Sequence, residues 1–256
     1  MTFTYNDTPV SFQIHGQGPP VVLLHGFLES SSMWEILIPE FSASRQLIIP
    51  DLPGFGKSGV LSTTHTMEEM AGVVQSLLEF LKTEEITLIG HSMGGYISLA
   101  CLELFPDKIK KVILLNSTPA PDSEERKQDR TRALEILDKK PKAFIAMTFS
   151  NWGGPDLSEK QKKILETYKK QVGSFPVSGI KAAVSGMKIR KDRTEVLKNF
   201  KGKKYFLLAK NDSVIPYEPT LKTARNCGAT IHSVTGGHMS LIEKTKETIE
   251  FLQLVC

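Results

Sequence analysis

The sequence predicts an α/β protein with a mostly parallel sheet that carries helices on both faces, and three observations predict it. Short uninterrupted apolar runs, at residues 21–24, 86–89 and 111–115, are typical of strands buried on both faces. Helical apolar patterns alternate with these runs, as in successive βαβ units. At 256 residues, the chain is long enough for one large α/β domain with an inserted segment.

The first half of the chain shows this alternation clearly. Two strand-like runs, at residues 2–5 and 10–14, flank the turn residues 6–9. This arrangement indicates an antiparallel edge hairpin. Thr66 followed by Glu69 is typical of a capping box at the start of a helix. The predicted elements are strands at 2–5, 10–14 and 21–24, a helix entered through 30–32, a strand at 46–50, a helix at 66–82, a strand at 86–89, a helix from Met93 and a strand at 111–115.

The alternation returns near the C-terminus. An apolar run at 204–209 predicts a buried strand, and a helical pattern follows it at 217–227. A further strand is predicted at 230–234, and a helix at 239–254 ends the chain. These elements predict that residues 1–118 and 196–256 together form the core.

Between these parts, residues 119–195 contain no convincing strand. Their pattern predicts a helical lid, or cap, inserted into the core. Proline and glycine breaks divide it into helices at about 122–138, 141–150, 158–173 and 176–190. Six large apolar lid residues are candidates either for an acyl pocket or for packing the lid onto the core: Phe144, Met147, Phe149, Trp152, Phe175 and Met187.

Charge is unevenly distributed. Residues 118–195 hold 17 Lys and Arg against 11 Asp and Glu, whereas the net charge of the whole chain is only +4. The runs Lys160–Lys163 and Lys188–Arg193 are most simply solvated helix faces, although they could also attract anionic substrates. A net charge this small gives no reason to expect binding to nucleic acid.

The composition also indicates in which cellular compartment the protein is expected. The first residues form neither a basic nor an apolar segment of a signal peptide, and no apolar run reaches the length of a membrane span. The three cysteines are scattered and form no disulfide framework. We therefore expect a cytoplasmic protein that does not act at a membrane. No cluster has the spacing of metal ligands, so no metal is expected.

The stretch Gly90-His91-Ser92-Met93-Gly94 is the strongest functional signal. It has the G-x-S-x-G pattern of a nucleophile elbow, in which a sharp turn between a strand and a helix exposes the serine hydroxyl. A strand is predicted before it and a helix after it, which is the context that this motif requires. The helix N-terminus would also offer free N–H groups beside Ser92. Ser92 is therefore the candidate nucleophile.

A serine needs a base, and the base needs a carboxylate that orients it. His238 lies between two glycines and a predicted helix, directly after a strand, and Asp212 follows the preceding strand. Among the other histidines, His15 and His65 are expected at the surface, and His91 is expected to point away from the Ser92 hydroxyl. We therefore predict His238 as the base and Asp212 as its carboxylate partner, with Asp51 as a weaker rival for Asp212.

These motifs together resemble the α/β-hydrolase fold family. The chain order Ser92, Asp212, His238 is the order expected of that family. The likeness extends over His25-Gly26-Phe27, the loop 51–58, the elbow and the segments around Asp212 and His238. The resemblance implies an oxyanion hole made by the backbone N–H groups of Phe27 and Met93. His25, Phe27 and Trp152 are candidate substrate contacts, and His25 is also expected to shape the oxyanion loop by hydrogen bonding.

The resemblance also implies a serine hydrolase that cleaves an ester or thioester of a small-to-medium acyl substrate through an acyl-enzyme, without a cofactor, as a monomer or homodimer. Other activities of the fold stay open: carbon–carbon bond hydrolase or lyase, perhydrolase, or ligand binding without turnover. Tyr96 stands where the menaquinone-pathway lyase that shares this elbow typically has an arginine. A nucleophilic aspartate, as in dehalogenases and epoxide hydrolases, is absent at position 92.

Overall fold

The fold is described from a computed structural model, which describes residues 1–150, 152 and 157–256. Its centre is a sheet of eight strands among these residues, in the order β1-β2-β4-β3-β5-β6-β7-β8. The strands are β1(Thr2–Tyr5), β2(Thr8–His15), β3(Pro20–Leu24), β4(Gln46–Pro50), β5(Ile86–His91), β6(Ile109–Leu115), β7(Lys203–Ala209) and β8(Thr230–Val234). β1 and β2 pair antiparallel at one edge, and β2 also pairs antiparallel with β4. From β4 to β8 all neighbours are parallel.

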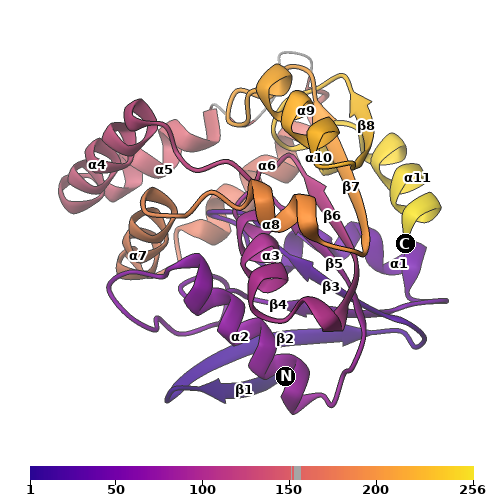
Figure 1. Ribbon diagram of the computed structural model, residues 1–256. Helices are drawn as coiled ribbons and strands as arrows, with labels where there is room; N and C mark the ends of the chain where they lie inside the picture. The colour runs from indigo at the N-terminus through magenta and orange to yellow at the C-terminus, as the bar shows by residue number, and fades with distance from the viewer. Residues whose placement is uncertain (151, 153–156) are drawn as a thin grey trace.

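Helices connect these strands (Figure 1). Those of the core are the 3₁₀ helices η1(Ser31–Leu37) and η2(Pro106–Lys108), and α1(Ile38–Phe41), α2(Met67–Phe80), α3(Met93–Leu104), α8(Thr194–Asn199), α9(Tyr217–Asn226), α10(Ser240–Glu243) and α11(Thr245–Val255). Four more lie between β6 and β7 and are called the helical insertion: α4(Glu124–Lys139), α5(Pro141–Ser150), α6(Glu159–Val172) and α7(Val177–Lys188).

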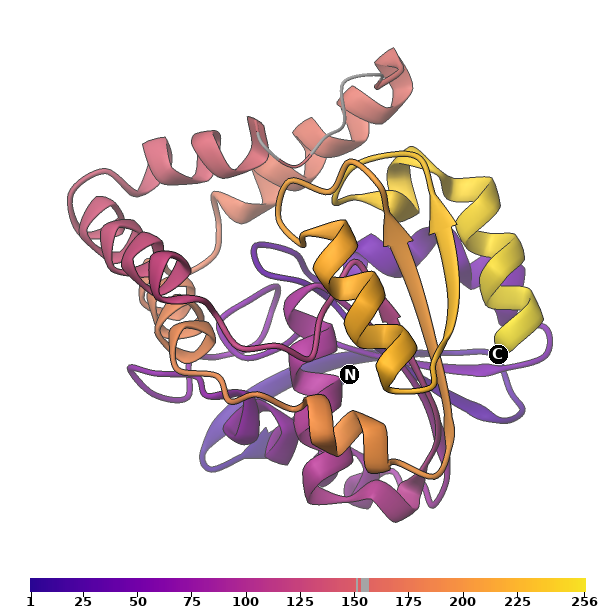
Figure 2. The same cartoon turned by 45° about the horizontal axis from the view of Figure 1, so that its top comes forward.

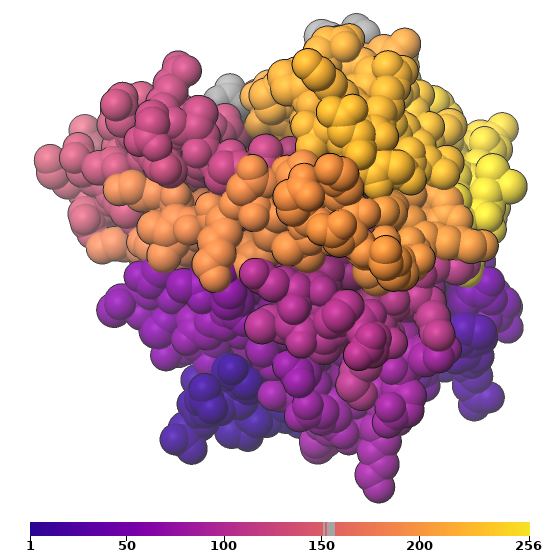
Figure 3. Space-filling view, viewed as in Figure 1, coloured from indigo at the N-terminus to yellow at the C-terminus, as the bar shows by residue number. Residues whose placement is uncertain are grey.

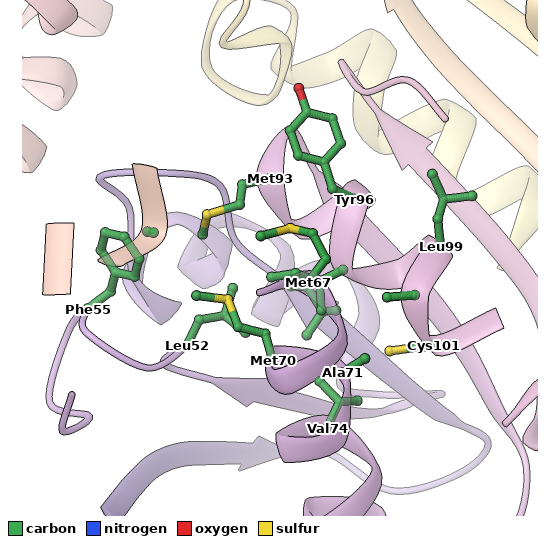
Figure 4. Packing of buried hydrophobic residues seen from close by; sticks show 14 of the residues in the cluster. Leu52, Phe55, Met67, Met70, Ala71, Val74, Met93, Tyr96, Leu99 and Cys101 are labelled. Carbon is green, nitrogen blue, oxygen red and sulfur yellow. The ribbon is translucent and has the colours of Figure 1, made fainter. Parts of the chain in front are cut away.

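Both faces of the sheet are buried, which explains the uninterrupted apolar runs. Because side chains alternate along a strand, Val22 and Leu24 of β3 pack in one apolar cluster and Val21 and Leu23 in the other. The first cluster includes α2, α3 and α9, and the second includes η1, α1 and α11. Figure 4 shows side chains of α2, among them Met67, packed towards α3. The expected α/β fold class with helices on both faces is confirmed.

The helical insertion projects from the core beside α9 and α10 (Figure 3) and extends over the carboxyl ends of β7 and β8 (Figure 2). It is tied to the core at several points. The Nε2 group of Gln161 donates to the carbonyls of Ile242 and Glu243, and the N–H of His65 donates to the carbonyl of Ala182. A Cβ atom at Gly186 would collide with the His65 carbonyl, so α7 approaches the core backbone closely. The division of the chain into core and lid stays a prediction.

Several local predictions were wrong. The helix expected after residue 30 is mostly a 3₁₀ helix, and the C-terminal helix is interrupted at Lys244. At α2, Thr66 accepts the N–H of Glu69, but the Glu69 carboxylate accepts from Ser62. Of the two hydrogen bonds of a capping box, we therefore observe only the one from the Glu69 N–H to the Thr66 hydroxyl.

His65 was expected at the surface but is fully buried. Its Nε2 accepts the N–H of Leu61 at 3.1 Å, and burial lowers the pKa of its imidazole to about 4. It is thus a neutral side chain that stabilises the turn before α2, beneath the helical insertion.

The charge run at residues 188–193 is only partly a solvated face: Lys191 is exposed, but the two arginines are not. The side chains of Arg190 and Arg193 are 5% and 2% exposed, respectively. Arg193 pairs with Glu68 of α2 and Glu103 of α3, and so connects the end of the insertion to the core. Lys160, by contrast, is exposed as expected.

Candidate active site

Ser92 lies on the turn between β5 and α3. Its φ of 49° is in the left-handed region, which is rare for a residue with a side chain and costs on the order of 1–3 kcal/mol. Glycine is required on both sides, because a Cβ atom at Gly90 would collide with the Gly94 carbonyl and one at Gly94 with the Leu24 carbonyl. The motif therefore forms the sharp strand-to-helix turn that its spacing predicts.

The structure brings the three predicted residues together. Ser92 Oγ lies 2.9 Å from His238 Nε2. On the other side of the ring, His238 Nδ1 lies 3.0 Å from each carboxylate oxygen of Asp212. Asp212 and His238 follow β7 and β8, whose carboxyl ends meet at the same edge as that of β5. The imidazole is thus positioned to accept a proton from the serine while its other nitrogen donates to the carboxylate.

The Asp212 carboxylate is held in its charged form. Oδ1 accepts the N–H groups of Val214 and Ile215, at 2.8 and 2.9 Å, and Oδ2 accepts from Asn116 Nδ2 at 2.9 Å. Burial by itself raises the pKa of Asp212. The neighbouring His238 and these hydrogen bonds outweigh burial, so the pKa lies below its usual value. A permanent anion beside Nδ1 favours the tautomer in which Nε2 can accept a proton.

No role is predicted from the sequence for Asn116, which directly follows the strand predicted at 111–115. Besides holding Asp212, its amide donates to the Gly237 carbonyl and accepts from Ser240 Oγ. Asn116 therefore connects the loop of the carboxylate with the loop of the base. The hydroxyl of Ser117, the next residue, donates to the carbonyl of Ser92 at 2.8 Å. The sequence signal that could have indicated these roles is the position of residues 116–117 directly after β6.

Two backbone N–H groups belong to residues near Ser92: Met93 follows it directly, and Phe27 lines the same cavity as Ser92. Met93 is the first residue of α3, so no carbonyl one turn earlier in the helix accepts its N–H. Phe27 lies in the loop after β3, where Leu28 has a φ of 57° that bends the chain. Within the described part of the chain, neither N–H has a hydrogen-bond partner. These two groups are the donors that the sequence suggested for an oxyanion.

A buried ion pair behind the site was not foreseen. His91 Nδ1 lies 3.0 Å from the Glu29 carboxylate, and Nε2 lies 3.0 Å from the His238 carbonyl. Both neighbours only accept hydrogen bonds, so a proton on each nitrogen satisfies them. Burial lowers the pKa of His91, but the charge of Glu29 and these bonds outweigh it and raise the pKa overall. Burial likewise raises the pKa of Glu29, and His91 outweighs it, so that pKa is lowered.

This pair connects three parts of the site. Glu29 also accepts the N–H of Gly26, next to Phe27 in the loop after β3. His91 precedes Ser92, and its Nε2 holds the backbone of His238. The loop, the elbow and the base are therefore fixed relative to one another by one imidazolium and one carboxylate.

A raised pKa at His91 has a measurable consequence for stability. The protonated ring stabilises the fold fully below the unfolded-state value of about 6.5, and this contribution is lost as pH rises through the higher folded value. We expect the difference in free energy of unfolding between wild type and His91→Gln to be largest near pH 6 and to shrink towards pH 9. Urea denaturation over this range measures it. A flat difference would mean that the folded pair binds no extra proton and that His91 is neutral.

His25 does not line the cavity, contrary to the expectation that it contacts substrate, but its hydrogen bonds agree with the expectation that it shapes the oxyanion loop. The ring is fully buried. Nδ1 donates to the Gly26 carbonyl at 2.8 Å and Nε2 accepts the N–H of Leu52 at 2.9 Å, so His25 shapes the loops after β3 and β4. Asp51, the weaker rival for Asp212, accepts the N–H groups of Ser31 and Lys57 and stabilises a turn.

A cavity of about 730 Å³ opens above Ser92 and His238. Its walls come from the core and from helices α4, α5 and α7 of the insertion. Phe27 and Trp152, two of the predicted substrate contacts, lie on these walls. The apolar insertion residues on the walls are Ala133, Ile136, Phe144, Met147, Trp152 and Met187. The apolar part of this lining, over a serine–histidine pair, suits an acyl group. Among the described residues, no cluster of His, Cys, Asp and Glu could hold a metal ion.

The eight-stranded sheet, the elbow after β5 and the three side chains at the strand ends define the architecture of an α/β hydrolase. A family model described as alpha/beta hydrolase fold matches residues 19–245, and the chain belongs to this family. The resemblance drawn from the sequence is confirmed.

Segments of this chain are also similar to individual hydrolases. The uncharacterized hydrolase YugF of Bacillus subtilis is 37% identical over 120 residues, which is 45% of this chain and 44% of YugF. A 2-hydroxy-6-oxo-2,4-heptadienoate hydrolase of Pseudomonas putida is 32% identical over 106 residues, 40% of this chain and 38% of that protein. The chain spans less than half the length of the curated relatives that it matches first, between 31% and 44%.

A solved structure matches over nearly the whole chain. A thermophilic esterase from Thermogutta terrifontis has a TM-score of 0.91 and 28% sequence identity, and the match covers 96% of this chain and 92% of the esterase. Among the described residues, we find no helix with the length and apolarity that crossing a membrane requires.

Proposed function

We propose that the protein is a serine hydrolase that cleaves an ester or thioester of a small-to-medium acyl substrate. The observation that carries this proposal is the continuous chain of hydrogen bonds from Ser92 through His238 to Asp212, at the floor of an apolar cavity. The overall likeness to a thermophilic esterase supports the same class of bond. The helical insertion, whose side chains line the cavity, would act as the lid.

The proposed mechanism follows from the geometry. His238 Nε2 takes the proton of the Ser92 hydroxyl as its oxygen attacks the substrate carbonyl, and Asp212 stabilises the imidazolium that forms. The N–H groups of Phe27 and Met93 donate to the oxyanion; removing such a donor typically costs ~2.7–4 kcal/mol. The alcohol or thiol then leaves with the proton from His238, and water hydrolyses the acyl-enzyme by the same steps in reverse.

A second candidate is hydrolysis of a carbon–carbon bond beside a carbonyl. The likeness to the Pseudomonas putida 2-hydroxy-6-oxo-2,4-heptadienoate hydrolase favours it, since the matched segment is 32% identical. The same three residues would serve, because that bond also breaks at an activated carbonyl. Perhydrolase activity and ligand binding without turnover stay as further alternatives.

The burst of product during the first turnover tests the ester proposal. An acyl-enzyme at Ser92 predicts rapid release of about one p-nitrophenol per site from a p-nitrophenyl ester, followed by slower steady turnover. Stopped-flow absorbance measures the burst, and a fluorophosphonate probe with peptide mapping identifies the labelled residue. Labelling at a residue other than Ser92, or no reaction in folded protein with any acyl chain length or acyl thioester, would contradict the proposal.

A further inference from the structure

Part of the cavity wall is basic. Among the described residues that line it, the charged ones are Arg126, Asp129, Arg130 and Arg132, all on α4. Arg132 pairs with Asp129, so these two charges balance. The positive charges of Arg126 and Arg130 therefore have no counter-charge among the described residues that line the cavity.

In the part of the chain that the structure describes, Asp122 is the one carboxylate that pairs with Arg130 and Arg190. Asp122 accepts from Arg130 Nε at 3.1 Å, and Arg190 Nη1 donates to the same carboxylate. Arg126 donates to the neutral carbonyl of Val214 at 3.0 Å. Two guanidinium groups thus share a single buried carboxylate, and Arg126 contacts a neutral carbonyl, which leaves positive charge in excess.

A second, smaller cavity of about 290 Å³ adjoins the first, and Tyr96, Arg126 and Val214 line both. Arg190 also lines the smaller cavity. Its guanidinium lies 4.1 Å from the centre of the Tyr96 ring, and its buried Nε has no hydrogen-bond partner within the described residues. A buried, unpartnered donor in a basic cavity favours an anionic ligand.

The basic corner is close to the nucleophile. Tyr96 is four residues after Ser92 on α3, a rise of about 6 Å along the helix. Both side chains line the same cavity. A molecule with its carbonyl at Ser92 therefore reaches the corner within a few bonds.

We propose that the corner formed by Tyr96, Arg126, Arg130 and Arg190 binds a carboxylate of the substrate, so that the preferred ester carries a negative charge a few bonds from the scissile carbonyl. This inference rests on ester cleavage at Ser92. The carboxylate supplies the missing counter-charge, and the apolar wall holds the carbon chain between the two ends.

Matched ester pairs test this proposal. One pair is the p-nitrophenyl monoester of adipic acid and the same ester with a terminal amide in place of the carboxylate. The other is 4-acetoxybenzoate and 4-acetoxybenzamide, which carry the group on the leaving side. We expect kcat/KM to favour the carboxylate member of at least one pair by on the order of ten- to a hundredfold. Equal or better cleavage of the amide in both pairs would overturn the proposal.

Variants on α4 assign the effect to its residues. Arg126→Gln and Arg130→Gln should remove most of the preference, and Arg126→Lys should keep part of it. The ratio within a pair cancels a general loss of activity. Lys127→Gln is the matched control: Lys127 carries the same charge on the same helix but pairs with Glu124 and does not line the cavity. If Lys127→Gln lost the preference for the carboxylate ester to the same extent, the preference would come from the overall charge of α4, and the proposal would be overturned.

A binding measurement separates this proposal from the proposed function. In Ser92→Ala, titration calorimetry with adipate and with adipamide reports on the corner without any turnover. Tighter binding of adipate that Arg126→Gln abolishes supports the corner even if no ester is cleaved, in which case the proposed function alone fails. Equal binding of the two compounds would overturn the corner.

Discussion

Ser92→Ala is expected to lower kcat/KM for ester hydrolysis by on the order of 10⁴- to 10⁶-fold. The hydroxyl is the atom that His238 Nε2 faces at 2.9 Å, and the described cavity lining offers no other side chain in contact with that nitrogen. Alanine meets the same backbone strain as serine at a φ of 49°, so the free energy of unfolding should change little. Steady-state kinetics and urea denaturation measure the two quantities.

Ser98→Ala is the control for this variant. Ser98 is a buried serine of α3, six residues after Ser92, but its hydroxyl donates to the Gly94 carbonyl and it does not line the cavity. It should lose far less activity, although it removes a buried hydrogen bond worth about 1 kcal/mol of stability. If the two variants lost activity to the same extent, packing of α3 rather than the nucleophile would explain the result.

The position of the candidate site was predictable because its signals are local. Ser92, Asp212 and His238 each follow a short apolar strand and lie beside glycine or turn residues. Parallel strands place their carboxyl ends at one edge, so a reading of strand order along the chain is enough to gather these residues. For the same reason, the fold class followed from periodicity alone.

What could not be predicted depends on partners distant in sequence. Glu29 is a single acidic residue in a loop, and only the fold brings it to His91, 62 residues away. Arg190 and Arg193 have the composition of a solvated face, yet they are buried against Asp122, Glu68 and Glu103. A pattern of charges does not specify which of them finds a counter-charge once the insertion packs onto the core.

Asp212→Asn is expected to lower kcat/KM by about 10⁴-fold at neutral pH. The backbone N–H groups of Val214 and Ile215 require an acceptor at the Oδ1 position. The asparagine oxygen must fill it, so the amide nitrogen takes the Oδ2 position, which is also 3.0 Å from His238 Nδ1, and there it competes as a donor to that nitrogen. The ring proton then moves to Nε2, which can no longer accept the proton of Ser92. Asn116, which donates to Oδ2, would also meet a second donor.

Asp51→Asn is the matched control, because Asp51 is a buried aspartate at the end of β4 that also accepts two backbone N–H groups. It lies outside the cavity lining, so stability should fall more than activity. The double variant Ser92→Ala/Asp212→Asn gives the sharper test. Residues that act as one unit are strongly non-additive, so the double variant should be no slower than Ser92→Ala alone. Additive losses would mean that Asp212 acts on a step in which Ser92 takes no part, and the proposed chain of proton transfer would be wrong.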